Sequence, residues 1–404
     1  MPHPRRLLPH TRARRIGDAR VVTGGQRLRP LSVCAMVACA TVACAPPSPA
    51  TTAARDPSPL DAPALQDLAV RGAGAPVHRI PALAVSTRGT LLAAWDGRPT
   101  LADVPSHIAI LMRRSEDSGR TWSPLDTVRA DTAPLGFGDP SLLVDRTTGR
   151  VFLFHAASVR QGFFGSSTAV NDDDPEVLHA DVSWSDDDGR TWQHRRLTSA
   201  IKRAGWGGLF AASGAGVQLA RGAHAGRLLQ PFVVRLGQAT YAAVLRSDDH
   251  GATWQMGELV GPDADEAEVA ERADGTVVLN ARARPFRRVA ISRDRGVTFD
   301  APVADTALVD PGNNAGLLAV PAIGDDALLL SHTADSTTRR RLVLRRSCDG
   351  GRHWQTPRIL VPEAAAYSTL ALLPSGDIGV LFERGAYDAI TFARVPRAWL
   401  GACP

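Results

Sequence analysis

The sequence is poor in features that would direct it to several common classes of protein. Only 5% of its 404 residues are aromatic, and three of these are tyrosines. It shows no sustained heptad pattern or long amphipathic helical run, which argues against a helical bundle. It shows no histidine or cysteine cluster with metal-ligand spacing, so we expect no catalytic metal and no cofactor. Glycine (36) and proline (29), by contrast, are frequent and indicate many turns.

Cysteine is scarce and unevenly placed. Cys34, Cys39 and Cys44 lie near the N-terminus, which leaves Cys348 and Cys403 for the folded part of the chain. In an exported protein, two such cysteines can form one disulfide. The alternative is a pair of free buried thiols.

Most of the chain has no net positive charge, although the total is +5. Residues 1–30 contain eight arginines and one acid, Asp18, so they carry +7 and the rest of the chain carries −2. A nucleic-acid-binding domain needs a basic face. We therefore expect no nucleic-acid partner.

The N-terminus has the pattern of an export signal. The arginine-rich stretch precedes LSVCAMVACATVACAPPSPA, an apolar run too short for an ordinary membrane span. TVAC, ending at Cys44, resembles a bacterial lipoprotein cleavage box, so either lipidation at Cys44 or simple cleavage nearby is expected. The predicted organisation is an export segment (1–45), a Pro/Ala/Ser/Thr-rich linker (46–68) and one domain (69–404). The protein would be secreted, periplasmic or lipid-anchored at the cell envelope.

One octapeptide occurs five times with the pattern S-x-D-x-G-x-[TH]-[WF]. The copies start 70, 62, 45 and 55 residues apart, which indicates repeated supersecondary units. They are SEDSGRTW from Ser115, SDDDGRTW from Ser185, SDDHGATW from Ser247, SRDRGVTF from Ser292 and SCDGGRHW from Ser347.

The aspartates of the second copy, Asp186, Asp187 and Asp188, suggest a calcium loop at first sight. An EF-hand needs a glutamate six residues after its glycine, and a helix on each side. The sixth residue after Gly189 is Arg195, and the flanking segments have the pattern of strands. We therefore interpret the octapeptide as a hairpin turn, in which the aspartate caps backbone N–H groups and the glycine takes a positive φ.

Strand-like segments precede each copy and also lie between copies, as in YAAVLRS, GRVFLFHAASV and GTVVLNARAR. About four short antiparallel strands per period are typical of a propeller blade. The sequence therefore predicts an all-β fold, a six-bladed β-propeller of four-stranded antiparallel blades with the octapeptides as turns. A closed propeller has no open sheet edge, so we expect a monomer.

Four further segments carry isolated polar residues: HRIPALAV, AAWDGRPTLADVPSH, DEAEVAERADGTVVLNARAR and AAAYSTLALLPSGDIGVLFERG. Together with the octapeptides, and in this order, they resemble the exported bacterial exo-α-sialidases (neuraminidases) of glycoside hydrolase family 33. In that family the octapeptide is called the Asp-box. The resemblance covers roughly residues 70–404. The Asp-box also occurs in other propellers, so alone it indicates fold and not activity.

The resemblance implies a role for each isolated residue. Arg79 would begin a triad of arginines that binds the substrate carboxylate, and Glu383 would pair with it. Asp103 would be the acid/base, Glu266 the catalytic glutamate and Tyr367 the nucleophile. The remaining residues with implied roles are Arg282 and Arg339 in the triad, and Arg98 and Asp139 in the substrate pocket.

Alternatives remain at three of these positions. Arg340 and Arg341 are neighbours of Arg339, and either could complete the triad. Asp265 and Glu268 flank Glu266, and either could be the base. Asp139 could simply cap a turn before a proline.

The chemistry of sialic acid suits these residue types. Its anomeric carbon bears a carboxylate, which three arginines can bind through bidentate contacts. An anionic nucleophile would meet like charge there, whereas a neutral phenol avoids it until a base removes its proton. Arg79 and Glu383 interrupt apolar strands, where a lone charge is costly, so each could be the partner of the other.

The resemblance leads to a first hypothesis, an exo-α-sialidase that acts on terminal sialic acids of glycans with retention of configuration. Trans-sialidases and intramolecular trans-sialidases use the same scaffold and residues. A non-catalytic, glycan-binding propeller is the alternative from another class. It predicts that the arginines, the tyrosine and the glutamate would be scattered or missing, whereas all are present in order.

Overall fold

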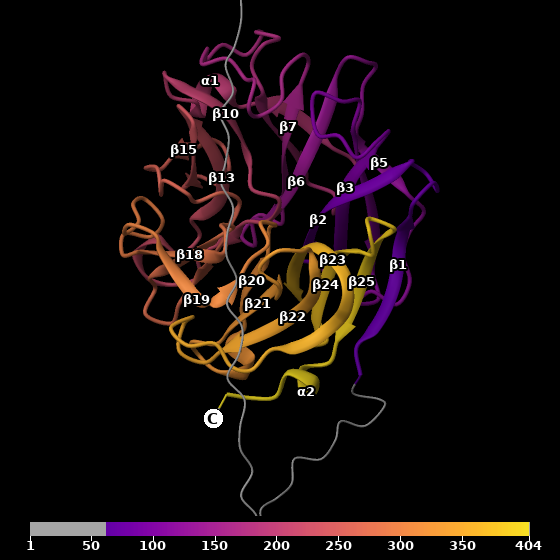
Figure 1. Cartoon of the computed structure of the whole chain (residues 1–404), viewed down its shortest axis with the longest axis vertical. Helices are drawn as coiled ribbons and strands as arrows, with labels where there is room; N and C mark the ends of the chain where they lie inside the picture. Colours follow the sequence, from indigo (N-terminus) through magenta and orange to yellow (C-terminus); the bar gives the residue numbers. More distant parts are fainter. Residues whose placement is uncertain (1–61, 404) are drawn as a thin grey trace, which may run out of the picture. The chain divides into compact units, whose positions relative to one another are not determined.

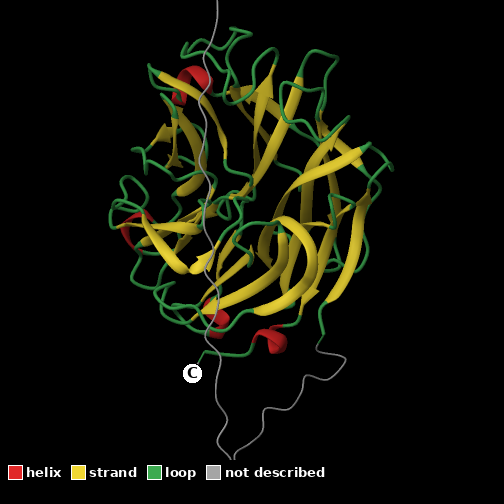
Figure 2. Ribbon diagram, viewed as in Figure 1, coloured by secondary structure: helices red, strands yellow, loops and turns green. Residues whose placement is uncertain are grey.

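The computed structural model describes residues 62–403. The predicted export segment, including Cys44, and the predicted linker up to residue 61 lie outside the described residues. Strands dominate the described part, and its helices are single turns (Figure 2). The sheets follow one another around a central axis in the order of the sequence (Figure 1). The described chain is a β-propeller with four-stranded blades.

Strands that are consecutive in sequence pair antiparallel in five sheets. One sheet contains β2 (Val77–Val85), β3 (Leu91–Arg98), β4 (Ala109–Ser115) and β5 (Asp126–Arg129). The next contains β6 (Gly136–Val144), β7 (Val151–Ser158), β8 (His179–Ser185), β9 (Gln193–Arg196) and β11 (Gly214–Ala215). The third contains β10 (Trp206–Ala211), β12 (Val217–Gln218), β13 (Leu228–Leu236), β14 (Ala239–Ser247) and β15 (Gln255–Met256). The fourth contains β16 (Ala267–Glu271), β17 (Val277–Ala281), β18 (Phe286–Ser292) and β19 (Val303–Val309).

The last sheet has seven strands: β20 (Gly316–Ala319), β21 (Leu328–Thr333), β22 (Arg340–Ser347), β23 (Arg358–Leu372), β24 (Ile378–Arg384), β25 (Ala389–Val395) and β1 (Ala64–Val70). The long strand β23 pairs with β22 through its first half and with β24 through its second half. The short helices are α1 (Thr198–Ile201), η2 (Gly222–His224), η3 (Pro321–Ile323) and α2 (Arg397–Leu400). None of these described helices is long and apolar enough to cross a membrane.

The domain begins earlier than the sequence indicates. Strand β1 starts at Ala64, inside the segment predicted as linker, and pairs with β25 at the other end of the chain. Asp67 on β1 accepts hydrogen bonds from Arg384 and Thr391. This strand is only partly buried, so it lacks the clear alternation by which a strand is recognised.

Aromatic residues of the octapeptides connect neighbouring sheets. Trp254, after β14, packs edge-on against Phe154 of β7 with ring centroids 5.0 Å apart. Trp122, after β4, packs in the same way against Phe392 of β25 at 5.2 Å. Such edge-to-face pairs add to the burial of apolar area, so the octapeptide stabilises the contact between blades as well as its own turn.

Each octapeptide closes the turn between the third and fourth strands of its blade. In the second copy Ser185 Oγ donates to Asp187 Oδ1 and accepts from Gly189 N, both at 2.8 Å. Thr191 donates to both carboxylate oxygens, through N at 2.8 Å and Oγ1 at 2.7 Å. Burial opposes ionisation, but these hydrogen bonds lower the pKa of Asp187 to about 2. The carboxylate is thus occupied by the turn itself. The hydrogen bond from the glycine N–H to the serine Oγ is 2.8 Å long in all five copies.

The octapeptides lie at one end of the blades, and the isolated residues lie at the other. Ser115, which begins the first octapeptide, pairs with Leu91 at the start of β3. Arg79 on β2 pairs instead with Asp96 near the end of β3. The fourth blade has the same polarity, because Ser292 pairs with Val277 at the start of β17.

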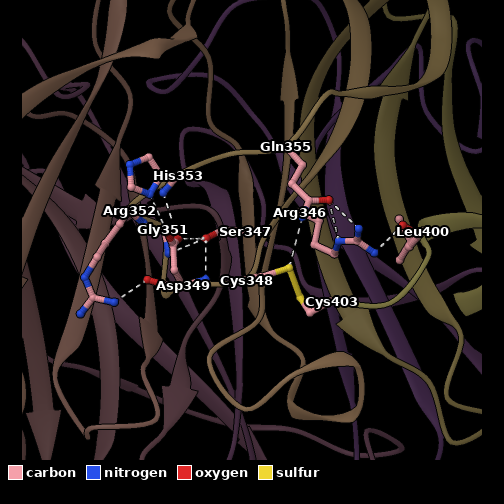
Figure 3. Close-up of a disulfide and its surroundings, with 10 residues drawn as sticks. All are labelled: Arg346, Ser347, Cys348, Asp349, Gly351, Arg352, His353, Gln355, Leu400 and Cys403. Atoms are coloured by element: carbon pink, nitrogen blue, oxygen red, sulfur yellow. Dashed lines mark hydrogen bonds and ion pairs between the residues drawn. A yellow bond between two sulfur atoms is a disulfide. The ribbon is translucent and has the colours of Figure 1, made fainter.

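Cys348 and Cys403 form a disulfide (Figure 3). It joins the fifth octapeptide to the segment that follows α2, across 55 residues of sequence. The neighbouring Arg346 donates to the Leu400 carbonyl oxygen at 2.9 Å, which also holds α2 against the sheet. Both links fix the C-terminal end of the described chain.

Candidate active site

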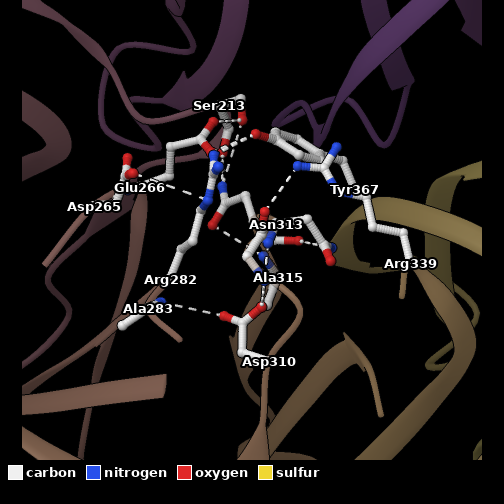
Figure 4. A network of polar contacts seen from close by, with 12 residues as sticks. Ser213, Asp265, Glu266, Arg282, Ala283, Asp310, Asn313, Ala315, Arg339 and Tyr367 are labelled. Carbon is white, nitrogen blue, oxygen red and sulfur yellow. Dashed lines mark hydrogen bonds and ion pairs between the residues drawn. The ribbon is translucent and has the colours of Figure 1, made fainter. Parts of the chain in front are cut away.

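A tyrosine on one strand meets a glutamate and an arginine at the ends of two other strands in one hydrogen-bonded group (Figure 4). Tyr367 on β23 donates its phenolic hydrogen to Glu266 Oε2 at 2.6 Å. Arg282, directly after β17, donates from Nη1 to the same oxygen at 2.6 Å and to the Tyr367 oxygen at 2.8 Å. Glu266, directly before β16, is only 2% exposed. The phenol is thereby placed between a proton acceptor and a fixed positive charge.

The electrostatics around this phenol keep it protonated. Burial raises the pKa of Tyr367 well above its ordinary value, Arg282 opposes the rise, and the Glu266 carboxylate adds to it. Arg339 and Arg79 also work to lower the pKa. The arginines therefore favour the phenolate, as the sequence suggests, but burial outweighs them and the pKa of Tyr367 stays raised.

Arg79 and Glu383 are each other's partners. The Arg79 guanidinium donates to the two carboxylate oxygens of Glu383 at 2.9 and 3.4 Å, and Glu383 is fully buried. The same carboxylate accepts from the backbone N–H groups of Ile80, at 2.9 Å, and Tyr367, at 3.2 Å. Ile80 takes a positive φ of 59°, an unusual conformation for a β-branched residue that a functional contact can justify. Glu383 therefore fixes the side chain of Arg79 and the backbone at Ile80 and Tyr367 at once.

Of the three consecutive arginines, Arg339 is the one turned toward this group. Its guanidinium lies 5.3 Å from the centre of the Tyr367 ring, and Arg79 lies 5.4 Å from the same ring. Arg339 also donates to the Tyr387 hydroxyl at 3.1 Å and to the Gly312 carbonyl at 2.8 Å. Arg340 instead pairs with an aspartate on the exterior, and Arg341 is exposed.

A second polar group surrounds Arg98. Its guanidinium holds Asp96 through two nitrogens, at 2.9 and 2.7 Å, and donates to Asp103 Oδ1 at 2.5 Å. Asp96 in turn accepts from the backbone N–H of Asp139 at 3.1 Å. The Asp103 side chain is 73% exposed, whereas Arg98 and Asp96 are buried. Asp103 therefore stands at the mouth of the site on a rigid buried support.

The two polar groups lie within electrostatic reach of each other. Burial, and then the charge of Asp96, raise the pKa of Asp139 well above its usual range, and Glu266 adds to the rise. Burial raises the pKa of Asp96 to about 6, although Arg98 opposes it. Asp139 has a positive φ of 58°. No described hydrogen bond joins Asp103 to Tyr367.

Comparison with known proteins shows which family this chain belongs to. A family profile described as a BNR repeat-like domain matches residues 89–380. The sialidase of Micromonospora viridifaciens is 46% identical over 383 residues, which cover 90% of this chain and 59% of that protein. Sialidase-2 of Mus musculus is 30% identical over 366 residues, which cover 82% of this chain and 95% of that protein. The chain belongs to the sialidase family.

A solved sialidase structure agrees with this assignment. The Hadza microbial sialidase Hz136 superposes with a TM-score of 0.74 at 29% identity, covering 80% of this chain and 66% of that one. The bacterial relatives, the BNR repeat and the propeller make this a member of the bacterial sialidases of the BNR/Asp-box propeller type. The chain spans less than two thirds of the Micromonospora sialidase and nearly all of the mouse sialidase.

The acids beside Glu266 take other places in this sialidase-family chain. Asp265 accepts from the Glu266 backbone N–H at 2.8 Å and lies 3.9 Å from Arg282 Nε. Glu268 is buried and accepts from the Ala215 backbone N–H at 3.2 Å. Burial raises the pKa of Glu268 well above its usual value. Of the three acids, Glu266 alone is hydrogen-bonded to the Tyr367 hydroxyl.

Sequence reasoning missed three side chains that contact the candidate site of this sialidase-family chain. Ser213 donates to Glu266 Oε1 at 3.0 Å, so the second carboxylate oxygen is also held. Tyr387 lies 4.4 Å beneath the Arg79 guanidinium and accepts from Arg339. Asp96 orients Arg98. Weak signals existed: Ser213 sits in the glycine-rich FAASGAG, and Tyr387 is one of only three tyrosines.

Within residues 62–403, no group of three or more His, Cys, Asp or Glu side chains is arranged to hold a metal ion.

Proposed function

We propose that the protein is an exo-α-sialidase, a glycoside hydrolase that removes terminal α-linked sialic acids from glycans with retention of configuration. The observation that carries the proposal is the 2.6 Å hydrogen bond from Tyr367 to the buried Glu266, with three arginines around the same phenol. Tyrosine is the nucleophile that distinguishes sialidases from most glycosidases.

The substrate carboxylate would bind Arg79, Arg282 and Arg339. Each guanidinium is held by protein groups that leave part of its donors free: Arg79 by Glu383, Arg282 by Glu266 and Arg339 by Gly312. Arginine suits this task because it is permanently charged and planar. Binding a carboxylate here also removes water, which strengthens each remaining charge interaction in the site.

In the first step, the Tyr367 oxygen would attack the anomeric carbon while Glu266 accepts the phenolic hydrogen. The bond from that carbon to the aglycone oxygen would break, and Asp103 would give its proton to the leaving oxygen. Arg282 stabilises negative charge on the phenol oxygen, since it donates to that oxygen at 2.8 Å. The products of this step are an aryl glycoside, in which the Tyr367 oxygen is bonded to the anomeric carbon, and a free aglycone.

In the second step, water would attack the same carbon from the face that the aglycone left. Asp103 would take the proton from this water, and Glu266 would return its proton to the Tyr367 oxygen as the linkage breaks. Two inversions at one carbon give net retention. Asp103 is suited to both roles because it stands exposed at the mouth of the site, where aglycone and water exchange.

Arg98 and Asp139 would contact the part of the sugar ring that lies away from the carboxylate. The support for this role is their connection through Asp96, next to Asp103. A carboxyl group with a raised pKa, such as Asp139, can donate a hydrogen bond to a sugar hydroxyl or carbonyl oxygen near neutral pH.

We further propose that the seven-stranded sheet is two blades that share β23, which gives six blades, with the octapeptides acting as five Asp-box turns.

We also propose that the protein is exported, either cleaved near Cys44 or lipidated there. The Cys348–Cys403 disulfide supports export, since disulfides persist mainly in oxidising compartments. Isolating the chain from culture fluid and from membranes, with mass analysis of its N-terminus, tests the proposed export and the proposed processing near Cys44.

Release of a fluorescent aglycone from a synthetic α-sialoside tests the proposed activity. Tyr367→Phe should reduce the rate by about a thousandfold or more, because it removes the nucleophile. Tyr241→Phe, at a half-buried tyrosine on β14, is the matched control and should behave as wild type. Wild-type inactivity on several sialosides would reject a sialidase. Analysis of the released sugar separates hydrolysis, which gives free sialic acid, from transfer, which gives an anhydro sugar or a new sialoside.

A further inference from the structure

Large apolar side chains are exposed on two loops at the mouth of the site. Phe164 is 79% exposed, more than any other large apolar residue between residues 62 and 403. It lies in the loop 159–178 between β7 and β8, at the blade end opposite the octapeptides. Val170 in the same loop and Leu101 in the Asp103 loop are also exposed. Apolar groups gathered beside a polar site are a recognised sign of a ligand-binding surface.

Phe164 is presented by a well-anchored loop. Its ring packs edge-on against Phe163 at 5.1 Å, and Phe163 packs edge-on against Phe210 of β10 at 5.1 Å. Arg235 of β13 donates to the backbone carbonyls of Phe163, at 3.3 Å, and Ser166, at 3.1 Å. An aromatic ring held in this way binds a ligand without first losing the entropy of a mobile loop.

This loop touches the loop that carries Asp103. At Gly162 the chains are so close that a Cβ would lie 2.1 Å from the carbonyl oxygen of Val104 and 3.3 Å from Pro105. Val104 directly follows Asp103, so Phe164 lies two residues from the point where the two loops meet. The bare glycine permits this contact, and the contact sets the position of Phe164 relative to the acid/base.

We propose that Phe164 forms a subsite for the sugar to which the sialic acid is attached, stacking on the apolar C–H face of a pyranose ring. The inference rests on the proposed function, in which Asp103 protonates the oxygen that joins sialic acid to its aglycone. The aglycone must therefore leave the site on the side of Asp103, where Phe164 is exposed. Aromatic rings provide a large, rigid contact area at low entropic cost. Sialosides with a sugar aglycone are thus the preferred substrate class.

The test compares two substrates that differ only beyond the scissile bond: sialyllactose, whose aglycone is a sugar, and methyl α-sialoside, whose aglycone has no ring. The measured quantity is the ratio of kcat/KM for the two. In Phe164→Ala this ratio should fall by about three- to tenfold, mainly through a higher KM for sialyllactose. Phe164→Trp, which keeps an aromatic face, should retain the wild-type ratio.

Val303→Ala is the matched control, because Val303 is 64% exposed on the outer strand β19 and should leave the ratio unchanged. An unchanged ratio in Phe164→Ala would overturn the subsite, and so would an equal loss on both substrates. If wild type cleaves neither substrate, the proposed function itself fails. If wild type cleaves methyl α-sialoside but the ratio does not respond to Phe164→Ala, only this inference fails.

Discussion

Tyr367 donates its phenolic hydrogen to Glu266 across 2.6 Å, although 101 residues separate the two in sequence. Two strands of the propeller, β16 and β23, bring them together, and Ser213 and Arg282 hold the glutamate on either side. A carboxylate so placed can accept the proton of one specific phenol and of no other described tyrosine. The predictions about activity follow from this pairing.

Replacement of Glu266 by glutamine should reduce the rate of sialoside cleavage by about 10²- to 10⁴-fold, because the amide cannot accept the phenolic proton. Glu268→Gln is a matched control two residues further along the chain, on β16, with similar burial and no described hydrogen bond to Tyr367. It should retain near wild-type activity in the same fluorescence assay. Equal losses in the two variants would mean that the loss of a buried carboxylate, and not of proton transfer, explains the effect.

Glu268→Gln should also change how stability depends on pH. Burial raises the pKa of Glu268 in the folded protein, so the folded state keeps a proton that the unfolded state loses above about pH 4.5. The wild-type protein therefore loses stability from this group as pH rises through that range, whereas glutamine does not titrate. Urea unfolding at pH 5 and pH 8 should show glutamine gaining on wild type as pH rises. If the difference in free energy of unfolding between the two proteins is the same at both pH values, the pKa of Glu268 is not raised in the folded state.

The repeated turns could be predicted from sequence, because the residues that form each turn lie within one octapeptide. Within five residues of one copy, the serine forms hydrogen bonds with both the aspartate and the glycine. The turn can therefore be recognised without knowledge of the fold. Arg79, Glu266 and Tyr367 were predicted in another way, from the resemblance of their segments and of the order of these segments to a known family. Strand β1 was missed because its partner, β25, lies more than 300 residues away and its own sequence is largely exposed.

Contacts between segments far apart in the sequence explain why Ser213 and Tyr387 were missed. Ser213 meets Glu266 across 53 residues, and Arg339 meets Tyr387 across 48. Neither pair has a motif, because the spacing depends on the lengths of loops between strands and not on a repeat. Phe164 gave no signal either, since an exposed aromatic in a polar loop becomes meaningful only when the loop is seen beside Asp103.

The octapeptide aspartates should matter for stability and not for metal binding. Asp187→Ala should lower the free energy of unfolding by about 1–2 kcal/mol, because it leaves the N–H groups of the turn without their acceptor. Asp186→Ala removes only an exposed ion pair with Arg150 and should cost less than about 0.5 kcal/mol. Chemical denaturation measures both. Chelators should leave the melting temperature unchanged. A lower melting temperature in the presence of a chelator would support a calcium site in the octapeptides.

The disulfide should stabilise the domain without taking part in the chemistry. Cys348 belongs to the fifth octapeptide, at the opposite end of the sheets from Tyr367, so Cys403→Ser should leave kcat near the wild-type value. In the chain-entropy model, closing a loop of this length contributes at most about 4 kcal/mol, so the variant should unfold at lower denaturant. Unfolding with and without reductant provides the control. Reductant should shift the wild-type midpoint to that of Cys403→Ser and leave the variant unaffected. A wild-type midpoint that ignores reductant, with two thiols found by mass analysis, would show that the bond does not form.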